Sequence, residues 1–319
     1  MKHFIRLGFI LWWWMTGAAL AQTYPTKPVT IVVPFAPGGV TDVVARLYAR
    51  KLAALTGGVF NVDNKAGAGG TIGTDFVARA PKDGHVLGMA IDSHTITPSL
   101  MAKLSYDPIK DFTPIGMMAV GQHIIVAHPS FAPNNIKELI DYAKSKPGEP
   151  YASSGTGTAQ HLGMEMLKLK AGIKLTHVPY KGGGQAINDV VSGQVKVAIL
   201  GIAPVLPFIK SGQLKVLALT GETRSALFPQ VGTVQETVPE FVTLQWFSMV
   251  APAGIPKEVQ LRLNELLARV SQDPEIRQRL SAVALDVQLS AQPSDLTRFM
   301  EQDMSKWPPL VKAADIKPE

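Results

Sequence analysis

Short β-branched runs alternate with helical patterns along most of the chain. The run at 29–33 (VTIVV) is typical of a buried strand. It is followed at 34–39 by PFAPGG, where prolines end a sheet ladder and two glycines permit a sharp turn. Thr41 and Asp42 are the expected N-caps of a helix whose apolar positions recur through 44–55. Such a strand–turn–helix unit offers backbone N–H groups and the positive end of a helix dipole to an anion.

The same alternation continues to residue 220. Further strands are expected at 59–62, 86–91, 115–127 (one or two strands), 151–153, 174–178, 195–200 and 215–220. Helices are expected at 74–80, 95–104, 136–145, 159–170, within 182–194, and at 205–210, with turns over 106–114. Residues 244–254 form an extended segment, followed by amphipathic helices at 256–270, 273–280 and 295–307. Strands separated by helices predict an α/β fold with mostly parallel, helix-covered sheets.

The order of these elements predicts two lobes. Two αβ modules are followed by a helical tail that is too polar to stand alone, so we expect it to pack on the first module. The first lobe then comprises 22–122 plus 248–319, the second comprises 123–247, and the chain crosses between them twice. Trp246 is expected to be a core residue at a crossing.

The N-terminus has the pattern of a secretory signal. A basic start and an apolar run precede Ala19-Leu20-Ala21, which predicts a signal peptide at 1–21, cleaved after Ala21, and a mature periplasmic chain from Gln22. The alternative is a membrane anchor, but the apolar run is shorter than the roughly 20 residues that a spanning helix needs.

Composition narrows the function classes. The 319 residues suffice for two cores, and 46% hydrophobic with 18% charged residues are globular values. The formal charge of +6 falls to +4 when Lys2 and Arg6 leave with the signal, and the basic residues are scattered, so nucleic acid is not an expected partner. The chain has no cysteine, which excludes thiolate chemistry, and its histidines show no metal-ligand spacing. We expect no metal and no cofactor.

The loop at 34–42 has a second version at 153–161, SSGTGTAQH, which also lies between an expected strand and helix. Two such helix N-termini that face each other across a cleft would hold a small carboxylate between them. The alternative is that both loops are ordinary turns with no role in binding.

Six motifs in order resemble a known family. They are YPTKPVTIVVPFAPGGVTD, NKAGAGGTIG, SYDPIKDFTPIG, SSGTGTAQHLGMEML, HVPYKGGGQA and APAGIP, which extend from Tyr24 to residue 256, and the likeness continues to near Trp307. The chain resembles the substrate-binding proteins of tripartite tricarboxylate transporters, the Bug family of periplasmic solute receptors.

The resemblance implies a two-lobed fold, like type II periplasmic binding proteins, that closes on a small organic acid and performs no chemistry on it. It also implies a membrane permease as partner, and we expect a monomer. Carried onto this chain, the family's ligand-binding positions are Phe35, Ala36, Gly38, Gly39 and Asp42 in the first lobe, Ser153, Ser154, Thr156, Thr158 and His161 in the second, and Tyr180 and Lys181 near the entrance.

Two segments depart from or vary within the family pattern. Family members commonly have Asn-Pro where this chain has Thr97-Pro98, beside Asp92, Ser93 and His94. Residues 200–203, which include Ile202, are variable in the family. Ser93 and Ile202 are therefore expected to help set ligand choice.

Three other functions were weighed. A secreted serine hydrolase would use Ser154 and His161, but the chain has no G-x-S-x-G elbow. A dinucleotide site at 67–73 is disfavoured because its third glycine falls one place too late. A module that binds a partner protein would expose a broad apolar patch.

Overall fold

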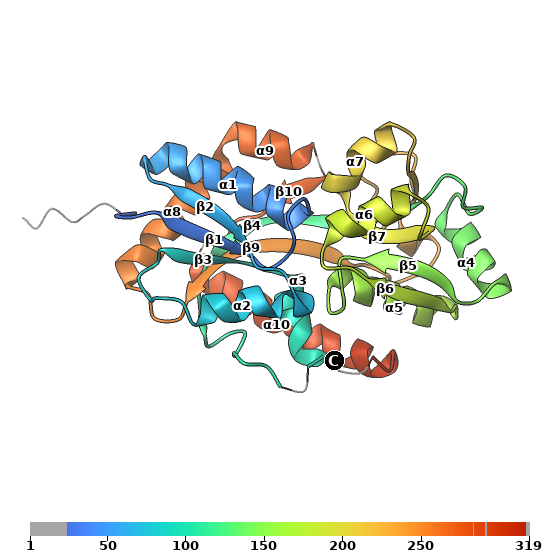
Figure 1. Ribbon diagram of the computed structural model, residues 1–319, viewed down its shortest axis with the longest axis horizontal. Helices are drawn as coiled ribbons and strands as arrows, with labels where there is room; N and C mark the ends of the chain where they lie inside the picture. The colour runs from blue at the N-terminus through green and yellow to red at the C-terminus, as the bar shows by residue number, and fades with distance from the viewer. Residues whose placement is uncertain (1–23, 102, 283, 291, 317–319) are drawn as a thin grey trace, which may run out of the picture.

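The described strands form one continuous sheet that runs the length of the molecule (Figure 1). The computed structural model describes residues 24–101, 103–282, 284–290 and 292–316, so the predicted signal peptide and its cleavage site lie outside the described residues. The strands are β1 (Val29–Val33), β2 (Phe60–Asn64), β3 (Val86–Ile91), β4 (Phe112–Ala127), β5 (Glu149–Ser153), β6 (Leu175–Pro179), β7 (Val197–Gly201), β8 (Lys215–Leu219), β9 (Leu244–Pro252) and β10 (Leu285–Val287). Their order is β2-β1-β3-β9-β4-β7-β5-β6, with β8 and β10 each paired to β4.

Helices cover both faces of this sheet (Figure 1). The α-helices are α1 (Val40–Thr56), α2 (Thr71–Ala78), α3 (Asp92–Ile96), α4 (Ile136–Ser145), α5 (Ala159–Ala171), α6 (Gly183–Val191), α7 (Ile202–Lys210), α8 (Lys257–Gln272), α9 (Pro274–Ser281) and α10 (Pro293–Ala313). The short 3₁₀ helices are η1 (Ala68–Gly70), η2 (Thr97–Ser99) and η3 (Val234–Glu236). None of these described helices is both long and apolar enough to cross a membrane.

Two long strands connect two lobes. β4 pairs with β9 from Phe112 to Gln122, and then with β7 from His123 to Ala127. The first lobe contains β1, β2, β3 and β10, and the second contains β5 to β8 (Figure 1). The expected parallel pairings occur as β1–β2, β1–β3, β5–β6 and β5–β7. The whole sheet is nevertheless mixed, because β4 and β9 run antiparallel to their neighbours.

β4 is longer than expected. Turns were predicted up to residue 114, but the strand begins at Phe112 and continues unbroken for 16 residues. Pro114, Gly116 and Gly121 weaken the local strand signal. Irregularities in the pairing with β9 at 114–116 and 117–119 absorb these residues. Pairing between distant segments therefore decides the structure here.

Helix α8 of the C-terminal tail packs on the first lobe, whereas α10 contacts both lobes. Leu263 and Leu266 of α8 lie in the same buried cluster as Val29 and Ile31 of β1. Trp246 is also buried, in a neighbouring cluster of that lobe, which confirms it as a core residue. This arrangement returns the C-terminal segment to the lobe in which the described chain begins.

The segment after β3 is the main local error of the predictions. A helix was expected at 95–104, but α3 begins directly at Asp92, where β3 ends, and η2 closes the segment at Ser99. The absence of a loop between β3 and α3 places Asp92 at the carboxyl edge of the sheet, where open α/β folds bind ligands.

Candidate functional site

The loop between β1 and α1 is held by a buried aspartate. The predicted N-caps are wrong, because Gly39 is the N-cap of α1 and has no side chain to cap it. Asp42 instead accepts hydrogen bonds from Gly38 N (3.2 Å), Arg46 Nε (3.0 Å) and Asn64 Nδ2 (3.1 Å). Burial alone would raise the pKa of Asp42, but these donors outweigh it and the pKa lies below its usual value. Asp42 is thus an anion that orders the loop.

The loop between β5 and α5 is held by its own hydroxyl groups. Thr158 is the N-cap of α5: its Oγ1 accepts the N–H of His161 (3.3 Å) and donates to Gly155 O (2.8 Å). The buried Ser153 Oγ accepts the N–H of Gly155 (3.1 Å) and lies 2.6 Å from Nε2 of His177. These bonds fix the loop while leaving Ser154 and Thr156 half-buried at its tip.

The two lobes approach each other at these loops and at the neighbouring segments 67–70 and 181–184. The backbone N–H of Ala36 donates to the carbonyl of Lys181 in the second lobe (3.3 Å). A Cβ on Gly69 of the first lobe would lie 2.8 Å from the carbonyl oxygen of Thr156 in the second. A Cβ on Gly184 would lie 3.3 Å from the carbonyl oxygen of Pro37. Backbone atoms of the two lobes therefore come close at these points, and a side chain at Gly69 would clash with the second lobe.

An inner cavity lies between the loops. It encloses about 390 Å³ of empty space, part of it open to solvent. Its lining residues come from both lobes: Phe35, Gly39, Val40, Thr41, Ile91, Asp92, Ser154, Thr158, Gln160, Gly183, Gln245 and Phe247. The lining residues thus combine apolar side chains with hydroxyls, side-chain amides and one carboxyl group.

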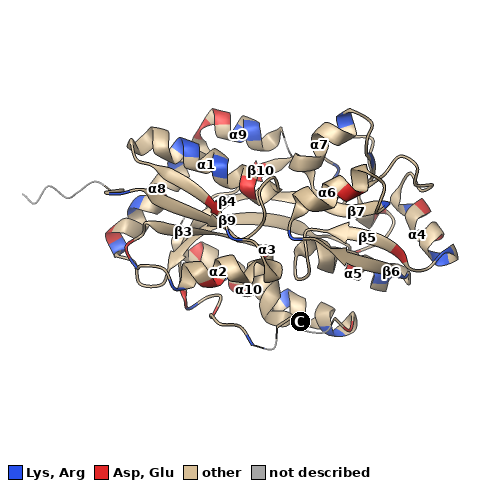
Figure 2. Cartoon of the chain, in the orientation of Figure 1, with Lys and Arg blue, Asp and Glu red and all other residues tan. Residues whose placement is uncertain are grey.

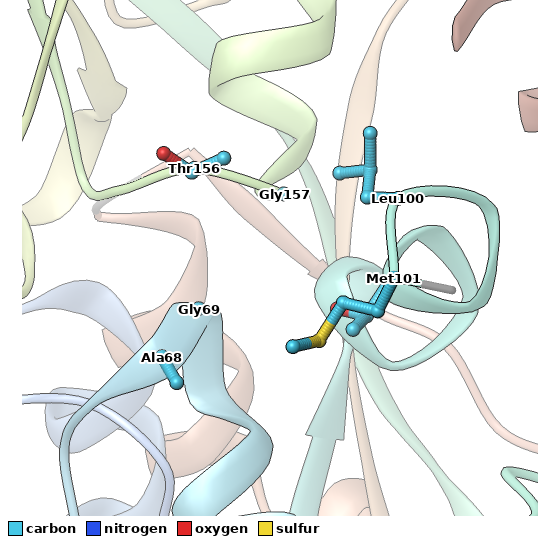
Figure 3. Close-up of a pocket in the computed structure, with 7 residues that line it drawn as sticks. Ala68, Gly69, Leu100, Met101, Thr156 and Gly157 are labelled. Atoms are coloured by element: carbon cyan, nitrogen blue, oxygen red, sulfur yellow. The ribbon is translucent and has the colours of Figure 1, made fainter. Parts of the chain in front are cut away.

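Two further cavities adjoin the same loops. An outer cavity is lined by Phe35, Gly67, Ala68, Gly69, Gly70, Ser154, Gly155, Thr156, Pro179, Tyr180 and Lys181. A third is bounded by Ala68 and Gly69 on one side, Thr156 and Gly157 on the other, and Leu100 with Met101 at its end (Figure 3). Thr156 lines both of these, and Phe35 and Ser154 line both the inner and the outer cavity, so the three cavities adjoin along a seam between the lobes.

Seven of the predicted site residues line this seam. They are Phe35, Gly39, Ser154, Thr156, Thr158, Tyr180 and Lys181. Ala36 and Gly38 belong to the first loop through their backbone hydrogen bonds, whereas Ser153 and Asp42 lie behind the loops as supports. Ser93, His161 and Ile202 are buried and are not among the lining residues of the three cavities.

His161 is positioned inside the second lobe. Its Nδ1 accepts the N–H of Gly157 (3.4 Å), its Nε2 lies 3.8 Å from Glu165 Oε1, and its ring stacks on His177 with centroids 4.0 Å apart. Ser154 uses its N–H to donate to Gln160 Oε1 (2.9 Å). These contacts give His161 a role in ordering the loop and the start of α5.

Several lining residues are not among the predicted site residues. The glycines at 67–70 match only a disfavoured nucleotide motif in the sequence, yet they line the outer cavity. Gln160 and Gln245 carried no local signal. Asp92 was noticed only as a neighbour of Ser93, although its place directly after a predicted strand was a usable signal.

Asp92 is the electrostatic exception in the seam. Its side chain is buried, with 5% of the residue exposed. Burial raises the pKa of Asp92 to about 7, and the charge of Asp303 adds to this rise. The N–H groups of Ala159 and Ser93 donate to its carboxyl group and lower the pKa, but they do not offset the effect of burial. Lys181 is the single cation among the lining residues of the three cavities, and it lines the outer one. Most other charges lie on outer helices such as α1, α4 and α9 (Figure 2).

The described residues contain no cluster of three or more His, Asp or Glu side chains that could hold a metal ion. Helix N-termini and hydroxyl groups from both lobes at the inner cavity are groups that can bind an anion.

Comparison with known proteins gives the same family from sequence and from structure. The family model described as "Tripartite tricarboxylate transporter family receptor" matches residues 44–316. The protein BugT of Bordetella pertussis is 34% identical over 93% of this chain and 92% of its own length. A structure of the periplasmic binding protein BugD is 36% identical, with a TM-score of 0.89 over 93% of this chain and all of its own. R. palustris Rpa4515 with adipate is 32% identical, also with a TM-score of 0.89, over 93% of this chain and 100% of its own.

Proposed function

Because this chain belongs to the tripartite tricarboxylate transporter receptor family, we propose that its inner cavity captures a small organic carboxylate for a permease of that type. As a member of this family it is a periplasmic solute-binding protein and not an enzyme. The relative solved with adipate supports an organic acid as the ligand class.

One observation carries the proposal: two helix N-termini from different lobes meet at one cavity. Gly39 is the N-cap of α1 and Thr158 is the N-cap of α5, and both line the inner cavity. The first turn of a helix has N–H groups without intrahelical partners and a positive dipole end. A carboxylate between these two helices would receive hydrogen bonds from both lobes and would favour their approach.

We assign the predicted residues to two tasks. Phe35, Gly39, Ser154, Thr156 and Thr158 would contact the ligand, with Tyr180 and Lys181 at the outer cavity. Ala36, Gly38, Asp42, Ser153 and His161 would order the loops, and Ser93 and Ile202 would act through their neighbours. Support for this division comes from the cavity linings and from the hydrogen bonds within each loop.

The lobes would close by a hinge. We place the first lobe at 22–122 plus 248–319 and the second at 123–247. The change of partner on β4, from β9 to β7 between Gln122 and His123, supports the first boundary. The hydrogen bond between Ala36 and Lys181 would form on closure and break on opening.

The mature protein would be a monomer that begins at Gln22 after cleavage behind Ala21. The basic start and the A-x-A pattern of the first 21 residues support this cleavage site.

The test is a thermal-shift screen of the mature chain against mono-, di- and tricarboxylic acids, with affinities of the hits measured by calorimetry. We expect at least one acid to raise the melting temperature, with a shift that grows with the logarithm of its concentration above the Kd. Failure of all carboxylic acids to stabilise the protein would contradict the proposal.

Substitutions at Gly39 test where the ligand binds. Its φ of −80° suits any residue, and a Cβ there would have ordinary contacts at 3.9 Å, so Gly39→Ala should fold normally. Gly39→Leu should fill the carboxylate position and weaken binding of the identified acid by about 2 kcal/mol or more. Unchanged affinity in a folded Gly39→Leu variant would move the site elsewhere.

A further inference from the structure

Asp92 is an acidic residue that lines the cavity proposed for the ligand. It is the first residue of α3, directly after β3, and it lines the inner cavity together with Gly39 and Thr158. Among the described residues that line the three cavities, it is the only acidic one. A site expected to bind anions thus contains one group that repels them when ionised.

No cation among the described residues balances the charge of ionised Asp92. The N–H groups of Ala159, at the start of α5, and of Ser93 donate toward its carboxyl group. Nε2 of His123 on β4 is 4.0 Å from Oδ2, and Asp303 on α10 contributes a like charge. Lys181 lines a different cavity. A carboxylate has about four acceptor positions, and two N–H groups leave capacity for a donor from a ligand.

The carboxyl group of Asp92 would interact differently with each kind of group on a bound acid. A second carboxylate of the ligand beside Asp92 would meet a like charge in a poorly solvated space. A plain methylene there would leave a buried acceptor unsatisfied. A hydroxyl or an ammonium group would donate to Asp92, and the ammonium would also balance its charge.

We propose that Asp92 is a specificity-determining residue that selects carboxylic acids carrying a hydroxyl or amino group, because it lines the inner cavity as its single acidic side chain. The inference rests on the proposed function and names the class of acid that the same cavity takes. The acid's carboxylate lies at the loops that precede α1 and α5, away from Asp92, and its donor group lies against Asp92.

The experiment uses sets of acids that differ only at the second carbon. The sets are propionate, lactate and alanine; succinate, malate and aspartate; and adipate, 2-hydroxyadipate and 2-aminoadipate. Affinities of each acid for the mature chain are measured by calorimetry. In the set that binds, the hydroxy or amino acid should bind at least about tenfold more tightly than the unsubstituted acid.

Asp92→Asn, which keeps the shape and removes the charge, should reduce that ratio to about threefold or less for the amino acid. Asp92→Ala should reduce it for both substituted acids. Asp141→Asn, on the exposed face of α4, is the matched control and should leave the ratio unchanged. Because each result is a ratio within one variant, a general loss of stability does not produce the expected pattern.

Three outcomes overturn the inference. The first is an unsubstituted acid that binds the natural chain as tightly as its substituted partners, which needs no variant. The second is a preference that survives in both Asp92 variants. In both of these cases carboxylates still bind, so the proposed function stands. The third is that no acid of any set binds, in which case the inference fails together with the proposed function.

Discussion

Two buried aspartates near the inner cavity have opposite electrostatic surroundings. Asp42 receives hydrogen bonds from Gly38, Arg46 and Asn64, and these keep its pKa low despite burial. Burial raises the pKa of Asp92 to about 7, and the two N–H groups that donate toward it do not offset this. The first is therefore a permanent anion that supports a loop, whereas the second changes its charge near neutral pH.

The raised pKa of Asp92 predicts a pH-dependent stability. Below the unfolded pKa of about 4 the group is protonated in both states, and as pH rises to 7 only the folded chain retains the proton. The stabilisation that protonated Asp92 provides is lost as pH rises through 7. Relative to the natural chain, Asp92→Asn should therefore gain stability between pH 5 and pH 8, as measured by urea unfolding at both values.

The groups that face Asp92 remain the same in this comparison. Burial lowers the pKa of His123 to about 3, so it stays neutral at both pH values, and Asp303 is present in both proteins. The difference between variant and natural chain then isolates Asp92. An equal difference in the free energy of unfolding at pH 5 and pH 8 would show that Asp92 titrates normally.

At the residue scale, a site residue could be predicted from the sequence where it belongs to a loop that directly follows a clearly predicted strand. Gly39, Ser154 and Thr158 were found because they follow strands that the sequence predicts. Gln160 and Gln245 were not, since a buried glutamine in a helix or strand has no local pattern that links it to a cavity. Their position depends on contacts between lobes, which only the folded chain defines.

At the element scale, helix N-termini connect stability to binding. Thr158 caps α5 and also lines the inner cavity, whereas Asn135 caps α4 through the N–H of Glu138, and α4 lines none of the three cavities. The two caps are chemically alike, but only the first belongs to the proposed site.

Removal of the two caps should therefore have different consequences. Thr158→Val and Asn135→Ala should each lower the free energy of unfolding by about 1 kcal/mol, because each leaves a helix N–H without its side-chain acceptor. Thr158→Val should also weaken binding of the identified acid, and Asn135→Ala should not. Equal affinities in the two variants would remove Thr158 from the site.

A helix or strand was predicted correctly where the local sequence pattern favours the same structure as the contacts of the folded chain. β1 and α1 follow from an apolar run, two prolines and a glycine turn. β4 did not, because Pro114 and Gly116 are turn signals that pairing with β9 overrides. β10 was missed because its three residues are too short to show a period.

At the scale of the whole molecule, the lobes touch at several points on the cavity seam. On the first lobe side these points are Ala36, Pro37 and Gly69, and each faces backbone of the second lobe. A separate apolar cluster joins Ile96 of α3, Leu162 of α5 and Trp307 of α10. Closure of the lobes thus requires close backbone contacts along the cavity seam and apolar packing in the cluster of α3, α5 and α10.

Gly184 should control that closure. It lies within α6, where a larger residue meets no backbone strain, but a Cβ there would come within 3.3 Å of the Pro37 carbonyl in the other lobe. Gly184→Val should hold the lobes apart, which would enlarge the radius of gyration in X-ray scattering with ligand and reduce affinity about tenfold or more. Asn188→Val, on the exposed side of α6, is the control, and an identical scattering profile and affinity for both variants would contradict this account.

The central claim, that loops from both lobes hold one carboxylate through backbone N–H groups, is tested most directly by a crystal structure of the mature chain with the acid found in the screen. The account predicts carboxylate oxygens within about 3.2 Å of N–H groups from both the β1–α1 loop and the β5–α5 loop. A carboxylate held by one lobe alone, or bound outside the seam, would contradict it.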